Sequence, residues 1–85
     1  MTYQVALSKR AERQLSKLDA DTQALIGAAI DILTIDPRPS GVKKLKGEEN
    51  VYRIRVRDYR ILYEIQDDEP LILVIKIGHR RDVYC

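Results

Sequence analysis

A strict alternation of apolar and basic residues in the middle of the chain limits the folds open to it. Over residues 51–57, Tyr52, Ile54 and Val56 alternate with Arg53, Arg55 and Arg57. Successive side chains of a β-strand point to opposite faces of its sheet, so one face of this strand is apolar and the other carries a row of arginines. The pattern predicts a strand that covers a hydrophobic core on one side.

Three further segments read as strands. Residues 3–7 alternate apolar and polar side chains, and residues 59–66 follow the alternating strand after a tight connection at Arg57 and Asp58. Residues 71–77 are almost all β-branched or leucine, which is typical of an interior strand covered on both faces.

Two helices are expected between the first strand and the others. Ser8 can cap a helix near residues 9–18, and Asp21 or Thr22 can cap a second, which carries an apolar stripe from Leu25 to Leu33. Pro37 ends that pattern. A short polar link joins the two helices, so they are predicted to form an antiparallel hairpin.

Helices and strands are segregated along the 85 residues, which predicts one α+β domain over residues 1–85. We expect the N-terminal strand and the two-helix hairpin to pack on a short, mainly antiparallel, twisted sheet. The chain has one cysteine, Cys85, and one histidine, so an internal disulfide and a protein-only zinc site are excluded. The sequence shows neither a secretory signal nor an apolar run of membrane-spanning length, which predicts a cytoplasmic protein without a membrane partner.

The net charge of +2 conceals an uneven distribution of charge in the second half of the chain. Its acidic residues lie mainly in two predicted turns, at residues 48–49 and 67–69, whereas arginines lie on the strands between them. Arg60 follows the turn after the arginine row, and residues 78–84 form a second basic cluster. Arginine presents a planar fork of donors that matches phosphate oxygens, so these segments predict a phosphate-binding face.

Simpler interpretations stay open for each of these residues. An arginine row on a solvent-facing strand also serves as an ordinary soluble surface. Arg57 and Arg81 each precede an aspartate and suit ordinary turn charges, and His79 suits a surface histidine. The lysines at 43, 44 and 46 fit a solvated loop as well as they fit phosphate contacts.

The order of three motifs resembles the RelE/ParE toxin superfamily, and within it the RelE branch. The motifs are Lys44–Gly47, Tyr52–Ile65 and Ile77–Tyr84. The resemblance implies a RelE-like fold and a ribosome-dependent endoribonuclease that cleaves messenger RNA in the ribosomal A site. In that reaction the 2′-hydroxyl attacks the adjacent phosphate, and neither a metal nor a cofactor is required.

The resemblance also implies roles for individual residues. The expected catalytic residues are Arg53, Arg55, Arg60, Arg80 and Tyr84. His79 is a candidate proton donor, because an imidazole titrates near neutral pH. From their charge, and not from the resemblance, the candidate RNA-binding residues are Lys43, Lys44, Lys46, Arg57 and Arg81. Well-known relatives have lysine at the positions of Arg53 and Arg55, and arginine cannot accept a proton, so a general-base role there is not expected.

Partners follow from the same resemblance. They are a cognate antitoxin protein, the ribosome with its messenger RNA, and operator DNA through the antitoxin complex alone. Two rival functions share the predicted fold. One is a ParE-like inhibitor of DNA gyrase that cuts no RNA, and the other is an inactive relative that binds RNA and leaves it intact.

Overall fold

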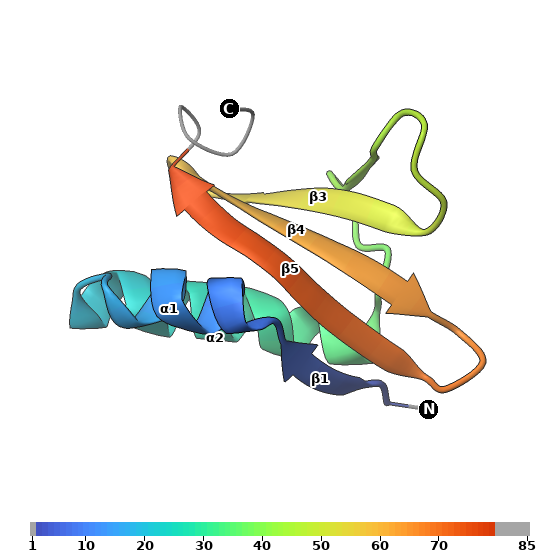
Figure 1. The fold of residues 1–85 in the computed structure, drawn as a ribbon, viewed down its shortest axis with the longest axis horizontal. Coiled ribbons are helices and arrows are strands. Elements are labelled where there is room, and N and C mark those ends of the chain that lie inside the picture. Colours follow the sequence, from blue (N-terminus) through green and yellow to red (C-terminus); the bar gives the residue numbers. More distant parts are fainter. Residues whose placement is uncertain (1, 80–85) are drawn as a thin grey trace.

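The computed structural model describes residues 2–79, which form two helices and a five-stranded sheet (Figure 1). In chain order the elements are β1 (Gln4–Leu7), α1 (Lys9–Ser16), α2 (Ala20–Ile35), β2 (Lys43–Lys44), β3 (Val51–Val56), β4 (Tyr59–Gln66) and β5 (Leu71–His79). Within the described residues neither helix is long and apolar enough to cross a membrane.

The strands lie in the order β1-β5-β4-β3-β2. β1 runs parallel to β5, and the other three neighbouring pairs are antiparallel. The predicted α+β class with a mainly antiparallel sheet is therefore confirmed. β5 lies between β1 and β4, as expected for an interior strand, but the helices cover only one of its two faces, so the predicted cover on both faces is wrong (Figure 1).

The helices lie on one side of the sheet, and the core is between the two layers (Figure 1). Ala11 of α1 packs with α2 and with the sheet residues that point toward the helices. The buried members of this core are Ala11, Ile26, Ile30, Leu33, Ile61, Tyr63, Ile65, Ile72, Val74 and Ile77. The opposite side of the sheet carries the side chains of Arg53 of β3 and Leu62 of β4, which are paired with each other. We call this side the open face.

α1 covers the edge of β5 beyond the point where β1 ends. β1 pairs with β5 as far as Val74, which leaves the edge of the next residues without a neighbouring strand. The hydroxyl of Ser8 donates to the carbonyl of Ile75 at 2.7 Å, and the backbone N–H of Ile77 donates to Oε1 of Gln14, also at 2.7 Å. The N-cap side chain of α1 and a side chain from its second half thus replace a strand in satisfying backbone groups of β5.

Several predicted boundaries shift in the structure. The first helix ends at Ser16, two residues earlier than expected, and β5 continues two residues further, to His79. The lysine-rich connection contains a strand of two residues, β2, which the sequence did not indicate. The tight connection at Arg57 and Asp58 is present, since Val56 pairs with Tyr59 across it.

Candidate nucleic-acid interface

Three predicted site residues lie together on the open face. Arg55 of β3 is paired with Arg60 of β4, and directly opposed residues point to the same face of a sheet. Arg53 lies two residues before Arg55 and is paired with Leu62, so its side chain shares that face. Arg55 is exposed, Arg53 is half-buried and Arg60 is buried, with 6% of its surface exposed. The predicted placement of arginines from two neighbouring strands on one face is therefore present.

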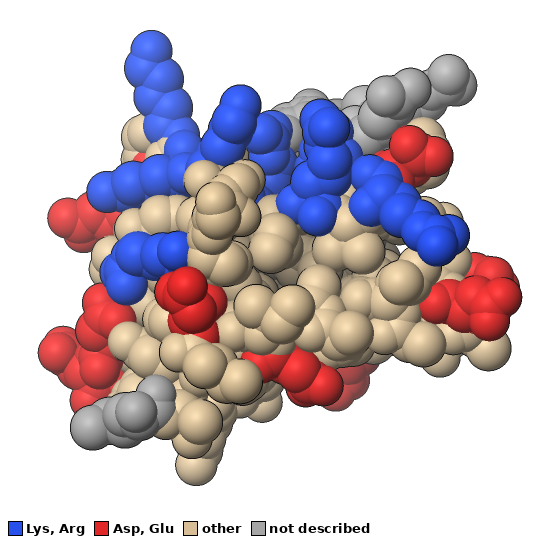
Figure 2. Space-filling model, turned by 180° about the vertical axis from the view of Figure 1, so that it is seen from behind, with Lys and Arg blue, Asp and Glu red and all other residues tan. Residues whose placement is uncertain are grey.

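Lys43 extends this row to the edge of the sheet. It is paired with Arg53 and is exposed. A groove of about 410 Å³ lies beside the pair, and it is lined by Ser40, Gly41, Lys43, Arg53, Ile54 and Arg55. Figure 2 shows lysine and arginine side chains gathered along the side of the molecule away from the helices, with acidic residues below them. The open face thus carries cations from three neighbouring strands, and three of them, Lys43, Arg53 and Arg55, line a groove.

Three of the predicted RNA-binding residues lie elsewhere. Lys44 is paired with Tyr52, which points toward the helices, so its side chain leaves the sheet on the side opposite to Lys43. Lys46 is exposed in the loop after β2. Arg57 lies beside Asp21 and other residues of α2, with which it lines a shallow hollow. The structure does not bring these three into the arginine row.

His79 also lies away from that row. It is paired with Tyr59, and the two rings meet edge to face with their centroids 5.8 Å apart. Arg60 follows Tyr59 along β4, so the imidazole and the guanidinium leave the sheet on opposite faces. Arg80, Arg81 and Tyr84 lie outside the described residues, and their predicted roles stay predictions.

Lys76 is a cation of the open face that the sequence did not reveal. It is paired with Leu62, whose side chain points to the open face, and 8% of its surface is exposed. The pairing shifts next to it, because Leu62 is opposite Lys76 whereas Tyr63 is opposite Val74. This β-bulge leaves Ile75 as an extra residue and turns Lys76 away from the core. A lysine in an otherwise apolar strand was the one available signal.

A second polar cluster joins distant parts of the chain on another side. We call it the Asp67 clasp. The hydroxyl of Tyr3 donates to Oδ1 of Asp67 at 2.6 Å, and Nη2 of Arg38 contacts Oδ2 at 3.2 Å. Nε of Arg38 also donates to the hydroxyl of Tyr52 at 3.2 Å. The hydrogen bond from Tyr3, followed by that from Arg38, lowers the pKa of the Asp67 carboxyl below its ordinary value. These contacts connect four segments, which indicates a structural role.

Tyr63 anchors this region from the core. It stacks on Tyr52 with ring centroids 6.0 Å apart, and its hydroxyl donates to the carbonyl of Pro37 at 2.8 Å. Burial raises the pKa of the Tyr63 hydroxyl far above its ordinary value. The predicted place of Tyr52 on the apolar side of the sheet agrees with these contacts.

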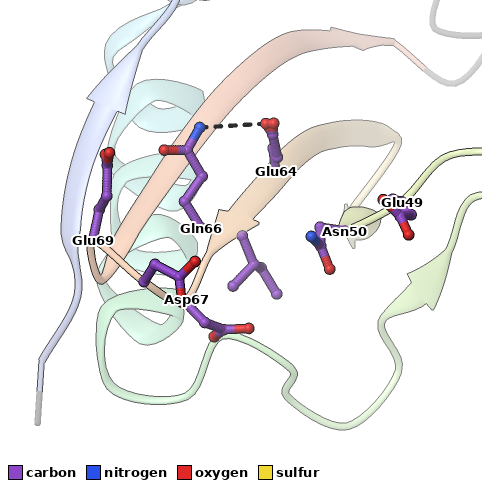
Figure 3. A pocket seen from close by; sticks show the side chains of 8 residues that line it. Glu49, Asn50, Glu64, Gln66, Asp67 and Glu69 are labelled. Carbon is purple, nitrogen blue, oxygen red and sulfur yellow. Dashed lines mark hydrogen bonds between the residues drawn. The ribbon is translucent and has the colours of Figure 1, made fainter.

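A hollow at the end of β4 has the wrong charge for a phosphate. It measures about 550 Å³ and lies at the end of β4 and its turn, as Figure 3 shows. Its lining includes Glu49, Glu64, Asp67, Asp68 and Glu69. Glu64 accepts a hydrogen bond from Nε2 of Gln66 at 3.3 Å. Carboxylates repel phosphate, so the part of the open face around Arg53, Arg55 and Arg60, and not this hollow at the other end of β4, is the candidate interface.

Comparison with known proteins agrees with this fold. This α+β fold is the fold of small toxins from type II toxin–antitoxin systems, which form the RelE/ParE superfamily. The family described as "ParE toxin of type II toxin-antitoxin system, parDE" matches residues 5–84, and the chain belongs to it.

Individual relatives are RelE-like along almost their whole length. The chain is 28% identical to toxin RelG of Mycobacterium tuberculosis, over 99% of this chain and 98% of that toxin. It is 27% identical to the mRNA interferase toxin RelE of Escherichia coli K12, over 94% of this chain and 85% of the relative. The RelE–RelB complex of Pyrococcus horikoshii OT3 contains a chain of similar structure, with a TM-score of 0.84, 30% identity, and coverage of 98% of this chain and 100% of that one.

Proposed function

We propose that this toxin is a ribosome-dependent endoribonuclease that cleaves messenger RNA in the ribosomal A site and so inhibits translation. The observation that carries the proposal is the convergence of Arg53, Arg55 and Arg60 on one face of the sheet. A relative with 27% identity is named an mRNA interferase, which supports the same activity. Messenger and ribosome are then partners of this chain, and its place of action is the cytoplasm.

The proposed reaction needs charge stabilisation more than it needs a cofactor. The 2′-hydroxyl attacks the neighbouring phosphorus, and negative charge develops on the phosphorane oxygens. Guanidinium groups aimed at that position stabilise the charge in the transition state. Arg55 and Arg60 are directly opposed, so both can reach one phosphate. Arg53 and Lys43 extend the contact along the RNA backbone, and Arg80 and Tyr84 are proposed to complete the site. In-line geometry would come from the ribosome, which fixes the messenger.

An antitoxin is the second proposed partner. Similar chains were solved as RelE–RelB complexes, which supports a cognate protein that binds this toxin and silences it. An acidic segment would complement the cationic open face. We propose that operator DNA is contacted by the complex through the antitoxin.

Inhibition of DNA gyrase is the second candidate function, and the matching family's description as a ParE toxin favours it. One experiment separates the two. The toxin is expressed without an antitoxin, messenger 5′ ends are mapped on translating ribosomes, and purified toxin is added to a gyrase supercoiling assay. Cuts within A-site codons support the nuclease. Intact messages with inhibited supercoiling refute it and support the second candidate, and intact messages with active gyrase refute both.

Variants sharpen this experiment. Arg60→Ala should lower the cleavage rate by about 10²-fold or more, because it removes a donor to the developing charge. Arg10→Ala is the matched control, since Arg10 is exposed on α1 in the helical layer. Equal cleavage by both variants would remove the open face from the mechanism.

A further inference from the structure

An irregularity in the pairing of β5 with β4 places Lys76 on the open face. The bulge beside Ile75 reverses the strand's alternation, so that Ile77 points into the core and Lys76 does not. Without the bulge, uninterrupted alternation from Val74 would send Lys76 toward the helices. Long cationic side chains are seldom as buried as this one, with 8% of its surface exposed. β-bulges often re-aim a side chain beside an active site.

Two of the proposed phosphate ligands, Arg53 and Arg60, lie near Lys76 on the open face, and Glu64 lies two residues from Leu62 on the other side along β4. Leu62 lies directly opposite it, and Arg53 lies opposite Leu62 on the next strand. The backbones of Lys76 and Arg53 are therefore two strand spacings apart, or about 10 Å, and their long side chains can approach each other above Leu62. Arg60 lies two residues from Leu62 along β4 and is paired with Gly78. Gly78 has no side chain, so no side chain from this position of β5 rises beside Arg60 and Lys76.

The chemistry of Lys76 differs in one respect from that of the three arginines. An arginine holds its proton at every biological pH, so Arg53, Arg55 and Arg60 can stabilise charge but cannot supply a proton. Lysine can release a proton to a reacting oxygen and regain it from water. His79, the proton donor expected from the sequence, projects from the other face of the sheet against Tyr59.

We propose that Lys76 contacts the scissile phosphate and is the general acid of the cleavage reaction, an inference that rests on the proposed nuclease function. The 2′-oxygen forms a bond to phosphorus as the bond between phosphorus and the 5′-oxygen breaks. The departing 5′-oxygen keeps the electron pair of that bond and takes a proton from the ammonium of Lys76. The proton of the 2′-hydroxyl passes to water, and the neutral amine regains a proton from water. The products are a 2′,3′-cyclic phosphate and a 5′-hydroxyl.

The test compares two leaving groups at the linkage that the wild-type protein cuts. That linkage is first mapped on ribosomes programmed with a defined messenger. A second messenger then carries sulfur in place of the bridging 5′-oxygen at the same linkage, because a thiolate leaves without needing a proton. On the oxygen substrate, Lys76→Met and Lys76→Arg should each be about 10²-fold slower than wild type. On the sulfur substrate both should approach the wild-type rate.

Controls separate this role from loss of charge and from misfolding. Lys17→Met removes an exposed lysine at the end of α1 and should not change either rate. Thermal unfolding checks that each variant is folded, and Lys76→Gln replaces Lys76→Met if that protein does not fold. His79→Gln should retain the oxygen-substrate rate.

Distinct results would overturn the inference. Wild-type activity of Lys76→Arg would show that charge alone is required, and equal losses of Lys76→Met on both substrates would show a structural role. Either result leaves the proposed nuclease intact. If the wild-type protein cuts neither messenger, the proposed function fails and the role of Lys76 fails with it.

Discussion

Arg57 adopts a backbone conformation that side chains with a Cβ rarely take. Its φ is 55°, and it is the first of the two residues that connect β3 to β4. Glycine takes a positive φ without steric cost, although it gains conformational entropy in the unfolded chain. We therefore expect Arg57→Gly to raise the free energy of unfolding by about 0.5 kcal/mol. Urea denaturation followed by circular dichroism measures the change.

Arg55→Gly is the matched control for this prediction. Arg55 lies inside β3 and is paired with Arg60, so glycine there lowers stability by about 1 kcal/mol. A fall in stability for Arg57→Gly would contradict the prediction and would show that contacts of the Arg57 side chain with α2 outweigh its backbone strain.

The alternation of side chains between the two faces of a strand explains which site residues could be predicted from the sequence. Arg53 and Arg55 alternate with apolar residues, so the sequence alone placed them on one face, and the tight turn then placed Arg60 near them. β5 offers no such guide, because apolar residues occupy both of its faces. The bulge beside Ile75 depends on pairing with β4, so the sequence could fix neither the face of Lys76 nor that of His79.

At the level of elements, Ser8 caps the N-terminus of α1 and also covers the edge of β5. Its Oγ accepts from the backbone N–H of Ala11 at 3.0 Å and donates to the carbonyl of Ile75 at 2.7 Å. Ser8→Ala removes both hydrogen bonds, so the free energy of unfolding should fall by about 1 to 2 kcal/mol. Ser16→Ala is the control, because its hydroxyl donates to Arg13 on the exposed side of the helix. Similar losses in the two variants would contradict a special role for Ser8.

The Asp67 clasp ties the residue before β1, the α2–β2 connection and the β4–β5 turn together through one carboxylate. Because the pKa of Asp67 is lowered in the folded state, its contribution to stability is present above the ordinary aspartate pKa. That contribution is lost as the pH falls below about 4 and through the lowered pKa. Wild type should therefore be more stable than Asp67→Asn at pH 6, and the difference should shrink toward pH 3. Thermal unfolding over this range measures it.

The neighbouring Asp68 supplies the control for the clasp. It is exposed in the same turn, and Asp68→Asn should leave the difference from wild type small at every pH. A constant gap between wild type and Asp67→Asn across the range would contradict the assigned role of the carboxylate.

Long helices and strands with a regular hydrophobic pattern could be predicted from the sequence. Short elements that exist only because they pair with a distant segment could not. The alternation in β3 and the apolar stripe of α2 identify both from local sequence. β2 has two residues and exists because Lys43 and Lys44 pair with β3, so no local periodicity could reveal it. The clasp likewise joins Tyr3 to Asp67, residues 64 positions apart.

At the scale of the whole molecule, charge is separated despite a net value of only +2. Cations lie along the open face, while carboxylates line the hollow at the end of β4 (Figures 2 and 3). A molecule with opposite charges in different regions is oriented as it approaches a polyanion, because its cationic side is attracted and its acidic side repelled. The open face should thus account for the electrostatic part of RNA binding.

Salt dependence distinguishes such a localised interface from diffuse attraction. Each phosphate contact with single-stranded nucleic acid contributes about 0.7 to the slope of log affinity against log salt concentration. The double variant Arg53→Gln and Arg55→Gln should therefore reduce the slope for a single-stranded RNA oligonucleotide by about 1.4. The charge-matched variant Arg10→Gln and Arg13→Gln, which changes exposed residues of α1, should keep the wild-type slope. Fluorescence anisotropy titrations between about 50 and 200 mM salt cover the range in which such slopes are resolved. Equal reductions in the two double variants would mean that RNA responds to the total charge of the toxin, and the open face would then have no special part in binding.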